Sequence, residues 1–184
     1  MAKKRTLKAT PNYQIEGKLQ PQAIELEQAV LGALMIDNES LSDAIDSLHA
    51  EYFYVTKHQK IFEAIINLFN NTEPVDILTV AEELKRLNAF DEIGGLAYIS
   101  ELTNNVSSAS NTEFHARIIA EKFIKRSLIN ISRKISNDAF DDSVDIFDLL
   151  NNAESELFTV TEGTLRKSFD KMSSLIKNAL DDIE

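Results

Sequence analysis

The most restrictive feature of this sequence is an uninterrupted helical pattern over residues 112–138, a stretch with neither glycine nor proline. Its apolar residues step by four, three and four positions, the spacing of a seam between two helices: Ile124, Leu128, Ile131 and Ile135. After a polar turn at residues 141–143, the same steps recur: Ile146, Leu150, Ala153 and Leu157. Two matched seams joined by a short turn predict an antiparallel helical hairpin over residues 112–160.

The two arms of this predicted hairpin carry opposite charge. Residues 121–137 contain five Lys or Arg and one acid, whereas residues 138–162 contain eight acids and no base. Exposed ion pairs contribute only about 0 to 1 kcal/mol each, so we expect apolar burial to hold the seam and charge to select its partner. Two arrangements satisfy the pattern. The chain self-associates through the two seams, or the hairpin closes within one monomer.

The residues before the hairpin predict a compact helical domain over residues 20–111. Apolar spacing indicates helices near residues 21–37, 39–48, 58–69, 79–87 and 96–102. Pro21 is expected in the first helical turn, and Thr79 with Glu82 and Ser110 with Glu113 form predicted capping boxes. Gly94 and Gly95 separate the last two of these helices. The buried stripe of the 58–69 helix is predicted from its spacing: Ile61, Phe62, Ile65, Ile66 and Phe69.

Both ends of the chain differ from this core. Residues 1–19 form a predicted flexible basic arm, because they mix Lys with polar residues and lack apolar periodicity. Residues 161–184 predict an amphipathic linker helix, too short to be stable alone, that docks outside this chain. Its apolar face is Phe169, Met172, Leu175, Ile176 and Leu180. The acids at its end oppose the helix dipole, so we expect the protein to continue past Glu184. The predicted fold class is therefore all-α: a compact helical bundle, a long antiparallel hairpin and a C-terminal linker helix.

Composition excludes several kinds of chemistry. The chain has no cysteine, which excludes disulfides, thiolate zinc sites and a cysteine nucleophile. It has no glycine-rich phosphate loop, and its three histidines lack metal-ligand spacing, so we expect neither cofactor nor metal in this chain. The net charge of −11 opposes tight binding of phosphate. No apolar run is long enough to span a membrane, so we expect a cytoplasmic protein without a membrane partner.

Candidate catalytic residues have structural explanations in the sequence. Acids gather at helix starts for electrostatic reasons, so the pairs Glu25 with Glu27 and Glu82 with Glu83 are interpreted as solvated surface. His58 is expected to cap or border its helix. An enzyme with Glu25 or His58 as acid–base groups requires a pocket that gathers them, which the sequence does not predict. The aromatic residues 52–54 (Tyr52, Phe53 and Tyr54) lack flanking Arg or Lys on their segment, which favours a core or interface role over base stacking.

The order of short blocks along residues 20–184 resembles the N-terminal region of DnaB-type replicative helicases. The matching blocks are ELEQAVLGALMID, YFYVTKHQKIFEAI, VDILTVAEELKRLN, IGGLAYISELTNNVSSASN, IIAEKFIKRSLI and AESELF. Each block is weak alone, but their order and spacing are specific. The sequence departs from the family at Tyr52, Ser107 and His115, where Asp, Pro and Tyr are usual, and none of these removes a catalytic group.

This resemblance implies a non-catalytic part of a hexameric helicase that encircles single-stranded DNA and moves 5'-3'. ATP and Mg²⁺ belong to a RecA-like motor domain absent from this chain. The resemblance also implies that the hairpins pair into a collar, a trimer of dimers, that the collar binds the C-terminal domain of primase, and that the linker helix packs on the neighbouring motor domain. A helicase loader is a further candidate partner. The alternative is a free-standing adaptor or loader-interacting protein, which a stop codon after Glu184 indicates and a downstream phosphate loop excludes.

Overall fold

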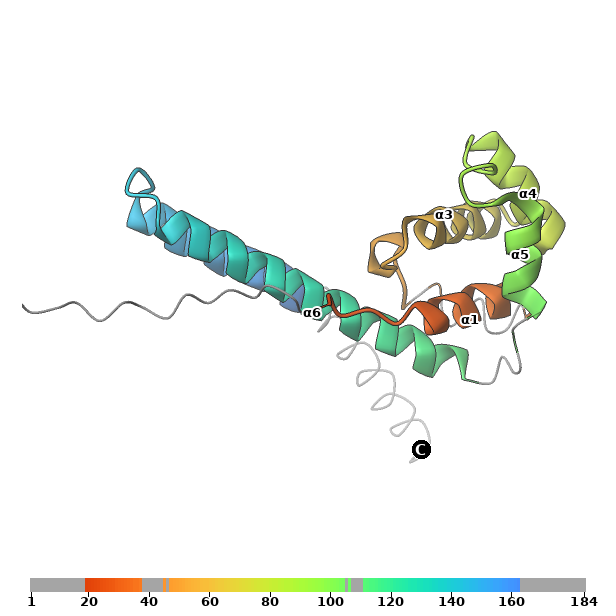
Figure 1. Cartoon of the computed structure of the whole chain (residues 1–184), viewed down its shortest axis with the longest axis horizontal. Coiled ribbons are helices and arrows are strands. Elements are labelled where there is room, and N and C mark those ends of the chain that lie inside the picture. Colours follow the sequence, from red (N-terminus) through yellow and green to blue (C-terminus); the bar gives the residue numbers. More distant parts are fainter. Residues whose placement is uncertain (1–18, 38–44, 46, 105, 107–110, 163–184) are drawn as a thin grey trace, which may run out of the picture.

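The computed structural model describes residues 19–37, 45, 47–104, 106 and 111–162, and every regular element in these residues is helical (Figure 1). This result confirms the predicted all-α class. The elements in chain order are α1 (Ile24–Leu34), the 3-10 helix η1 (Ala50–Tyr52), α3 (Thr56–Asn70), α4 (Ile77–Arg86), α5 (Gly95–Asn104), α6 (Thr112–Ala139) and a helix over residues 146–162. None of the described helices combines the length and apolarity needed to cross a membrane.

Three predicted segments lie outside the described residues. They are nearly all of the basic arm, most of the 39–48 helix, and the linker helix with Phe169, Met172, Leu175, Ile176 and Leu180. At the end of the second segment, Ile45 packs half-buried against the core and Leu48 is buried.

The first helix begins later than predicted. Its N-cap is Ala23 and its first residue is Ile24, so Pro21 precedes the helix instead of forming its first turn. Gly32 lies where α1 crosses α5. A Cβ atom on Gly32 would stand 2.2 Å from the backbone oxygen of Leu102, so only glycine allows this close approach. The two helices can therefore share the core side by side.

The structure corrects the start of α4. Asp76 is the N-cap, and its Oδ1 accepts the backbone N–H groups of Leu78 and Thr79 at 2.8 Å and 3.0 Å. The backbone N–H of Asp76 donates to Oγ1 of Thr79 at 2.9 Å, which completes a capping box. Thr79 is therefore the third residue of the helix, not its N-cap, and Glu82 has no part in the box. An aspartate carboxylate is at least as good an N-cap as a threonine hydroxyl, which explains the earlier start.

The other helices follow the predictions closely. In α3, Ile61, Phe62 and Ile65 are buried as expected, whereas Ile66 is half-buried and Phe69 is 37% exposed. At the start of α5, Gly94 and Gly95 adopt φ of 99° and 63°, the left-handed region that glycine enters without strain. The capping box predicted from Ser110 and Glu113 lies partly outside the described residues, because Ser110 is not among them. The N-cap of α6 is Asn111, which makes no side-chain cap bond.

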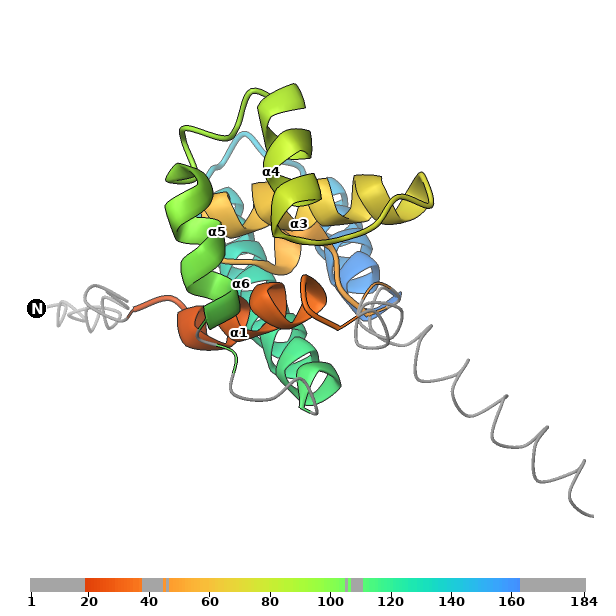
Figure 2. The same cartoon turned by 90° about the vertical axis from the view of Figure 1, so that its right-hand side faces the viewer.

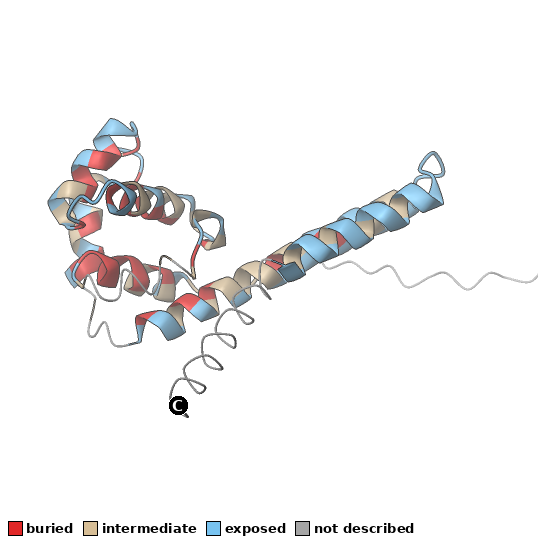
Figure 3. Ribbon diagram, turned by 180° about the vertical axis from the view of Figure 1, so that it is seen from behind, coloured by how far each residue is buried: buried red, intermediate tan, exposed pale blue. Residues whose placement is uncertain are grey.

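One apolar core joins α1, α3, α4, α5 and the first half of α6 (Figure 2). We call these helices together the globular part. The largest fully buried side chains come from all of these helices, from the segment before α3 and from the turn before α5: Leu31, Leu34, Leu48, Phe53, Ile61, Phe62, Ile65, Leu84, Ile93, Ile99, Leu102 and Ile119. In Figure 3 the buried residues concentrate in this part, and the far end of α6 is largely exposed.

The predicted hairpin is present. The first half of α6 packs on α1, and the second half projects away from the globular part with the 146–162 helix running back alongside it (Figure 1). Lys134 of α6 forms an ion pair with Glu156 of the returning helix. The long helix thus serves both as a wall of the core and as one arm of the hairpin.

Candidate functional site

The predicted seam residues of the hairpin are buried to different degrees. Ile131 is 9% exposed and lies at the centre of α6's seam, with Ile124 and Ile135 half-buried on either side. Leu128 is 40% exposed. On the returning helix Ala153 is half-buried, but the other three residues are exposed: Ile146 at 57%, Leu150 at 59% and Leu157 at 42%. The hairpin closes within one chain without covering these side chains.

The returning helix uses a neighbouring set of residues to face α6. Its least exposed positions also step by four, three and four: Leu149, Ala153, Glu156 and Val160. Glu156 within this set is the partner of Lys134. The predicted four-three-four spacing is thus present on the side of the helix that faces α6. It is made by Leu149 and Glu156, each one position before the predicted Leu150 and Leu157. We call the four exposed seam residues, Leu128, Ile146, Leu150 and Leu157, the hairpin apolar face.

Further large apolar side chains are exposed near the tip of the hairpin. Phe140 is 88% exposed, Phe147 is 71% exposed and Phe158, farther along the returning helix, is 59% exposed. Single exposed apolar residues are ordinary, but so many on two adjacent helices form a surface typical of protein–protein contact. The hairpin is therefore the leading candidate interaction surface of the described chain.

The junction between hairpin and globular part is built around Arg126. Its Nη1 donates to the backbone oxygen of Pro21 at 2.9 Å and its Nη2 to that of Tyr52 at 2.7 Å. The guanidinium carbon lies 5.5 Å from the ring centre of Tyr54 and 5.8 Å from that of Phe123. Burial lowers the pKa of Arg126, although the nearby Glu27 opposes this effect. The side chain thus binds two earlier segments of the chain. Pro21 precedes Arg126 by 105 residues and Tyr52 precedes it by 74.

This junction also explains the aromatic cluster. Phe53 is buried in the core, and Tyr52 stacks on Phe123 with ring centres 4.7 Å apart. The predicted core or interface role is confirmed for these two residues. Sequence reasoning found no cation beside the cluster, because Arg126 reaches it from α6 and not from its own segment.

A buried polar network links three helices of the globular part. His58 is fully buried, and its Nδ1 lies 2.7 Å from Oε2 of Glu27 in α1, while its Nε2 lies 2.7 Å from the hydroxyl of Tyr98 in α5. The other oxygen of Glu27 accepts the backbone N–H of Tyr54 at 2.7 Å. The expectation that Glu27 is solvated is therefore wrong. His58 is the third residue of α3 and points into the core, so the expectation that it caps or borders its helix is also wrong.

The hypothesis of an enzyme requires a pocket that contains both Glu25 and His58, and this network does not include Glu25. Glu25 is exposed and lines a cavity of about 470 Å³ between the start of α1 and α6, together with Ile24, Ile118 and Lys122. His58 is not among the residues that line this cavity. Because its ring is fully buried and bonded at both nitrogens, His58 is positioned to hold α1, α3 and α5 together.

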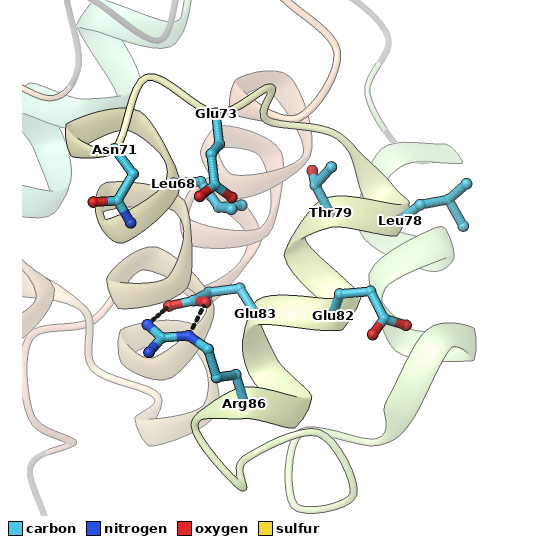
Figure 4. A pocket seen from close by; sticks show the side chains of 8 residues that line it. All are labelled: Leu68, Asn71, Glu73, Leu78, Thr79, Glu82, Glu83 and Arg86. Carbon is cyan, nitrogen blue, oxygen red and sulfur yellow. Dashed lines mark hydrogen bonds and ion pairs between the residues drawn. The ribbon is translucent and has the colours of Figure 1, made fainter.

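A second cavity, of about 700 Å³, opens between α3 and α4 (Figure 4). At its base Glu83 accepts hydrogen bonds from Nε and Nη2 of Arg86, both at 2.6 Å, and from Asn67 at 3.0 Å. The hydrogen bond from Arg86 lowers the pKa of Glu83, against a smaller opposing effect of burial. Glu82 is solvated as expected, but Glu83 is buried, which corrects the interpretation of this pair. Within the described residues, no cluster of three or more His, Asp or Glu side chains could hold a metal ion.

Comparison with solved structures finds the same fold. The N-terminal domain of DnaB helicase from Mycobacterium tuberculosis matches 76% of this chain and 99% of its own, with a TM-score of 0.72 and 30% identity. A structure that describes a DnaB-like replicative helicase and its interactions with primase matches 83% of this chain and 35% of its own, with a TM-score of 0.61 and 25% identity.

Sequence comparison finds the same group of proteins. The replicative DNA helicase DnaB of Rhodothermus marinus is 44% identical over 94% of this chain, and that of Geobacillus stearothermophilus is 38% identical over 91%. The aligned segment spans only 18% and 37% of these two relatives. The model of the DnaB-like helicase N-terminal domain matches residues 19–121, more than half of the sequence, and the chain belongs to this family.

Proposed function

We propose that this chain is the assembly and primase-docking module of a hexameric replicative helicase that unwinds DNA at the replication fork. The observation that carries the proposal is the exposed apolar surface of a hairpin that projects from the globular part. Its relatives are named replicative DNA helicases, and one similar structure is described together with primase. In this proposal ATP and Mg²⁺ act in the motor domain of the whole helicase, which works on the chromosome in the cytoplasm.

Self-association through the hairpin is the first part of the proposal. The hairpin apolar face, Leu128, Ile146, Leu150 and Leu157, becomes buried against the same face of a second copy, which supplies the dimers of a hexameric collar. Burying a leucine side chain contributes about 1.5 to 3 kcal/mol, so the apolar faces of two copies together can offset the roughly 4 to 15 kcal/mol that association costs. Ile124, Ile131, Ile135 and Ala153 support this surface from within the hairpin.

Sedimentation of the chain at micromolar concentration tests this part. We expect a dimer for the unmodified chain and at least about a hundredfold weaker association for the double variant Leu150→Asp with Leu157→Asp, because each charge would be buried in the contact. The matched control is Leu78→Asp with Leu96→Asp, two exposed leucines of α4 and α5. A strictly monomeric unmodified chain, or equal weakening by the control, contradicts the assignment of the hairpin.

The remaining partners follow from the same proposal. Primase, through its C-terminal domain, docks on the collar, and the linker helix with Phe169, Met172, Leu175, Ile176 and Leu180 docks on the motor domain of the next subunit. Single-stranded DNA passes through the full ring, and a helicase loader is the other protein partner. Titration calorimetry of this chain against the C-terminal domain of primase tests docking directly. We expect a measurable heat of binding. If the chain is dimeric but no heat is observed, primase docking is contradicted and self-association is kept.

A further inference from the structure

Positive charge is concentrated at the N-terminus of this acidic chain. Residues 1–18 contain five of its 19 Lys and Arg residues but only one of its 30 Asp and Glu residues. Four of these five bases stand around a single apolar residue, Leu7: Lys3, Lys4, Arg5 and Lys8. This basic arm joins the described residues at Leu19. A surface that binds the arm therefore needs a carboxylate next to an apolar place for one leucine side chain.

The cavity between α3 and α4 combines these two properties. Its volume is about 700 Å³, and both acidic and apolar side chains line it. Leu68 in its wall is buried, and Leu78 at its edge is 68% exposed. In Figure 4 the side chain of Glu73 extends from the loop between the two helices into the opening. The cavity thus offers an apolar wall beside a carboxylate.

The bases around this cavity are already paired with acids. Arg86 binds Glu83 at the base of the cavity, and Lys85 binds Glu82 in an ion pair at 2.6 Å. Glu73 raises the pKa of Arg86, but it does so less than Glu83, which bonds to it directly. Within the described part of the chain, Glu73 itself forms no ion pair. Its carboxylate is therefore the one in this cavity that is left for an incoming cation.

The arm begins within reach of the cavity. Arg126 binds the backbone oxygens of both Pro21 and Tyr52, so the start of the arm lies beside the segment that precedes α3. The cavity lies at the other end of α3, and a helix of 15 residues is about 22 Å long. The chain from Leu7 to Leu19 spans up to about 40 Å when it is extended. Leu7 can therefore reach the cavity of its own chain.

We propose that the basic arm docks in the cavity between α3 and α4 of its own chain, with Leu7 against Leu68 and Leu78 and a flanking base on Glu73. Exposed ion pairs are individually weak, but a tethered segment meets its site at an effective concentration of about a millimolar. A contact too weak to hold a free peptide therefore keeps the arm in place. This contact needs no second copy, so it does not depend on the self-association proposed above.

The tip of the hairpin is the rival site for a basic segment. It carries five acids, and no Lys or Arg lies between residues 135 and 162: Asp138, Asp141, Asp142, Asp145 and Asp148. Phe140 at the tip is 14 residues from Arg126, about 21 Å along the helix, so the tip and the cavity are about equally far from the arm. However, Phe140 is 88% exposed, and the tip has no enclosed place for Leu7. Net charge favours the tip, whereas apolar burial favours the cavity.

Crosslinking within one chain compares these sites, because the chain has no cysteine of its own. Thr6→Cys places one thiol beside Leu7. The second thiol is placed at one of three exposed positions: Asn71→Cys at the cavity, Ser143→Cys at the tip, or Glu63→Cys, which is closer than Asn71 to the start of α3. With a short bis-maleimide in low salt, we expect the reaction at Asn71 to be at least about fivefold faster than at the other two positions.

Two other results overturn the proposal. Equal rates at the three positions mean that the arm has no preferred site. A fastest reaction at Ser143 means that net charge alone attracts the arm. High salt screens exposed charges, so it is expected to bring the rate at Asn71 towards the rates at the two control positions.

Charge reversal identifies the contact. Glu73→Lys is expected to slow the reaction at Asn71 about fivefold, and Lys4→Glu with Lys8→Glu in the same chain is expected to restore it. The matched control is Glu63→Lys, which makes the same charge change at an exposed position of α3 outside the cavity lining. If Glu63→Lys slows the reaction as much as Glu73→Lys does, the cavity is not the site.

Leu7→Asp tests the apolar part of the contact. It is expected to slow the reaction at Asn71 more than Ile15→Asp, which makes the same change at another apolar residue of the arm. Equal effects would contradict the burial of Leu7 in the cavity.

An equimolar mixture of the single variants Thr6→Cys and Asn71→Cys reports contacts between copies. We expect little crosslinked dimer from this mixture at micromolar concentration, while the chain with both thiols reacts at a rate that does not change with dilution. Crosslinks that form mainly between copies would show that the arm occupies the cavity of a neighbour, and docking within one chain would then be wrong.

Discussion

At the scale of single residues, the molecule places two glutamates of one helix in opposite environments. Glu25 and Glu27 both belong to the first turn of α1, but only Glu27 is buried, where it meets His58 and the backbone N–H of Tyr54. A buried carboxylate persists only when its oxygens are hydrogen-bonded, and here both oxygens have partners. Glu27 is thus a structural centre of the globular part and not one of its solvated acids.

This difference gives a paired prediction. Glu27→Gln keeps the size of the side chain but replaces one acceptor oxygen by an NH₂ donor that faces His58 or a backbone N–H. We expect the free energy of unfolding to fall by about 1 to 3 kcal/mol. Glu25→Gln, two residues earlier and exposed, is the control and should change it by less than about 0.5 kcal/mol. Urea denaturation followed by circular dichroism measures both, and equal effects would contradict the buried role.

At the scale of secondary-structure elements, the start of α4 depends on Asp76. Its carboxylate accepts two backbone N–H groups, and the bond from Thr79 is the main cause of its lowered pKa. An N-cap of this kind stabilises a helix by about 0.5 to 2 kcal/mol relative to alanine. The N-cap lies three residues earlier than the sequence predicts, at Asp76 instead of Thr79. This difference matters because the capping group is then a titratable carboxylate and not a hydroxyl.

The cap therefore has a pH dependence with a defined sign. A lowered pKa in the folded state means that Asp76 contributes stability above its unfolded pKa of about 3.9 and loses that contribution as the pH falls through the folded value. Asp76→Ala should cost about 1 kcal/mol at pH 7, with a smaller difference from the parent below about pH 4. Thermal unfolding at both pH values measures this. Asp91→Ala, which removes an exposed acid between α4 and α5, is the matched control.

At the scale of the whole molecule, the sequence predicted what depends on local spacing and missed what depends on distant partners. The bounds of α6 were nearly correct because its pattern is long and unbroken, and the antiparallel return was predicted from the second set of steps. The residues of the returning helix that face α6 were predicted one position too late, at Leu150 instead of Leu149. Both residues are apolar, so spacing alone does not choose between them. Glu27 and His58 are 31 residues apart, so no local pattern could pair them.

Arg126 is the clearest case of such a distant effect, because it fixes how the hairpin leaves the globular part. In the sequence it is one base among several on a helical arm. In the structure the two Nη atoms of its guanidinium group donate to the backbone oxygens of Pro21 and Tyr52. A lysine could not bridge these two oxygens with the same planar geometry. We therefore expect Arg126→Ala to loosen the angle between the hairpin and the globular part while α6 itself stays helical.

Spin labels measure this angle directly, since Ser136→Cys on the hairpin and Glu63→Cys on α3 are the only thiols in the labelled chain. Dilution with unlabelled chain restricts the measured distances to single copies. Arg126→Ala should broaden the distance distribution and lower the free energy of unfolding by about 1 to 3 kcal/mol, because two carbonyls lose their donor. Lys125→Ala removes the neighbouring exposed cation and should change neither. If the distribution stays narrow in Arg126→Ala, then apolar packing of α6 on α1 sets the angle, and Arg126 contributes only stability.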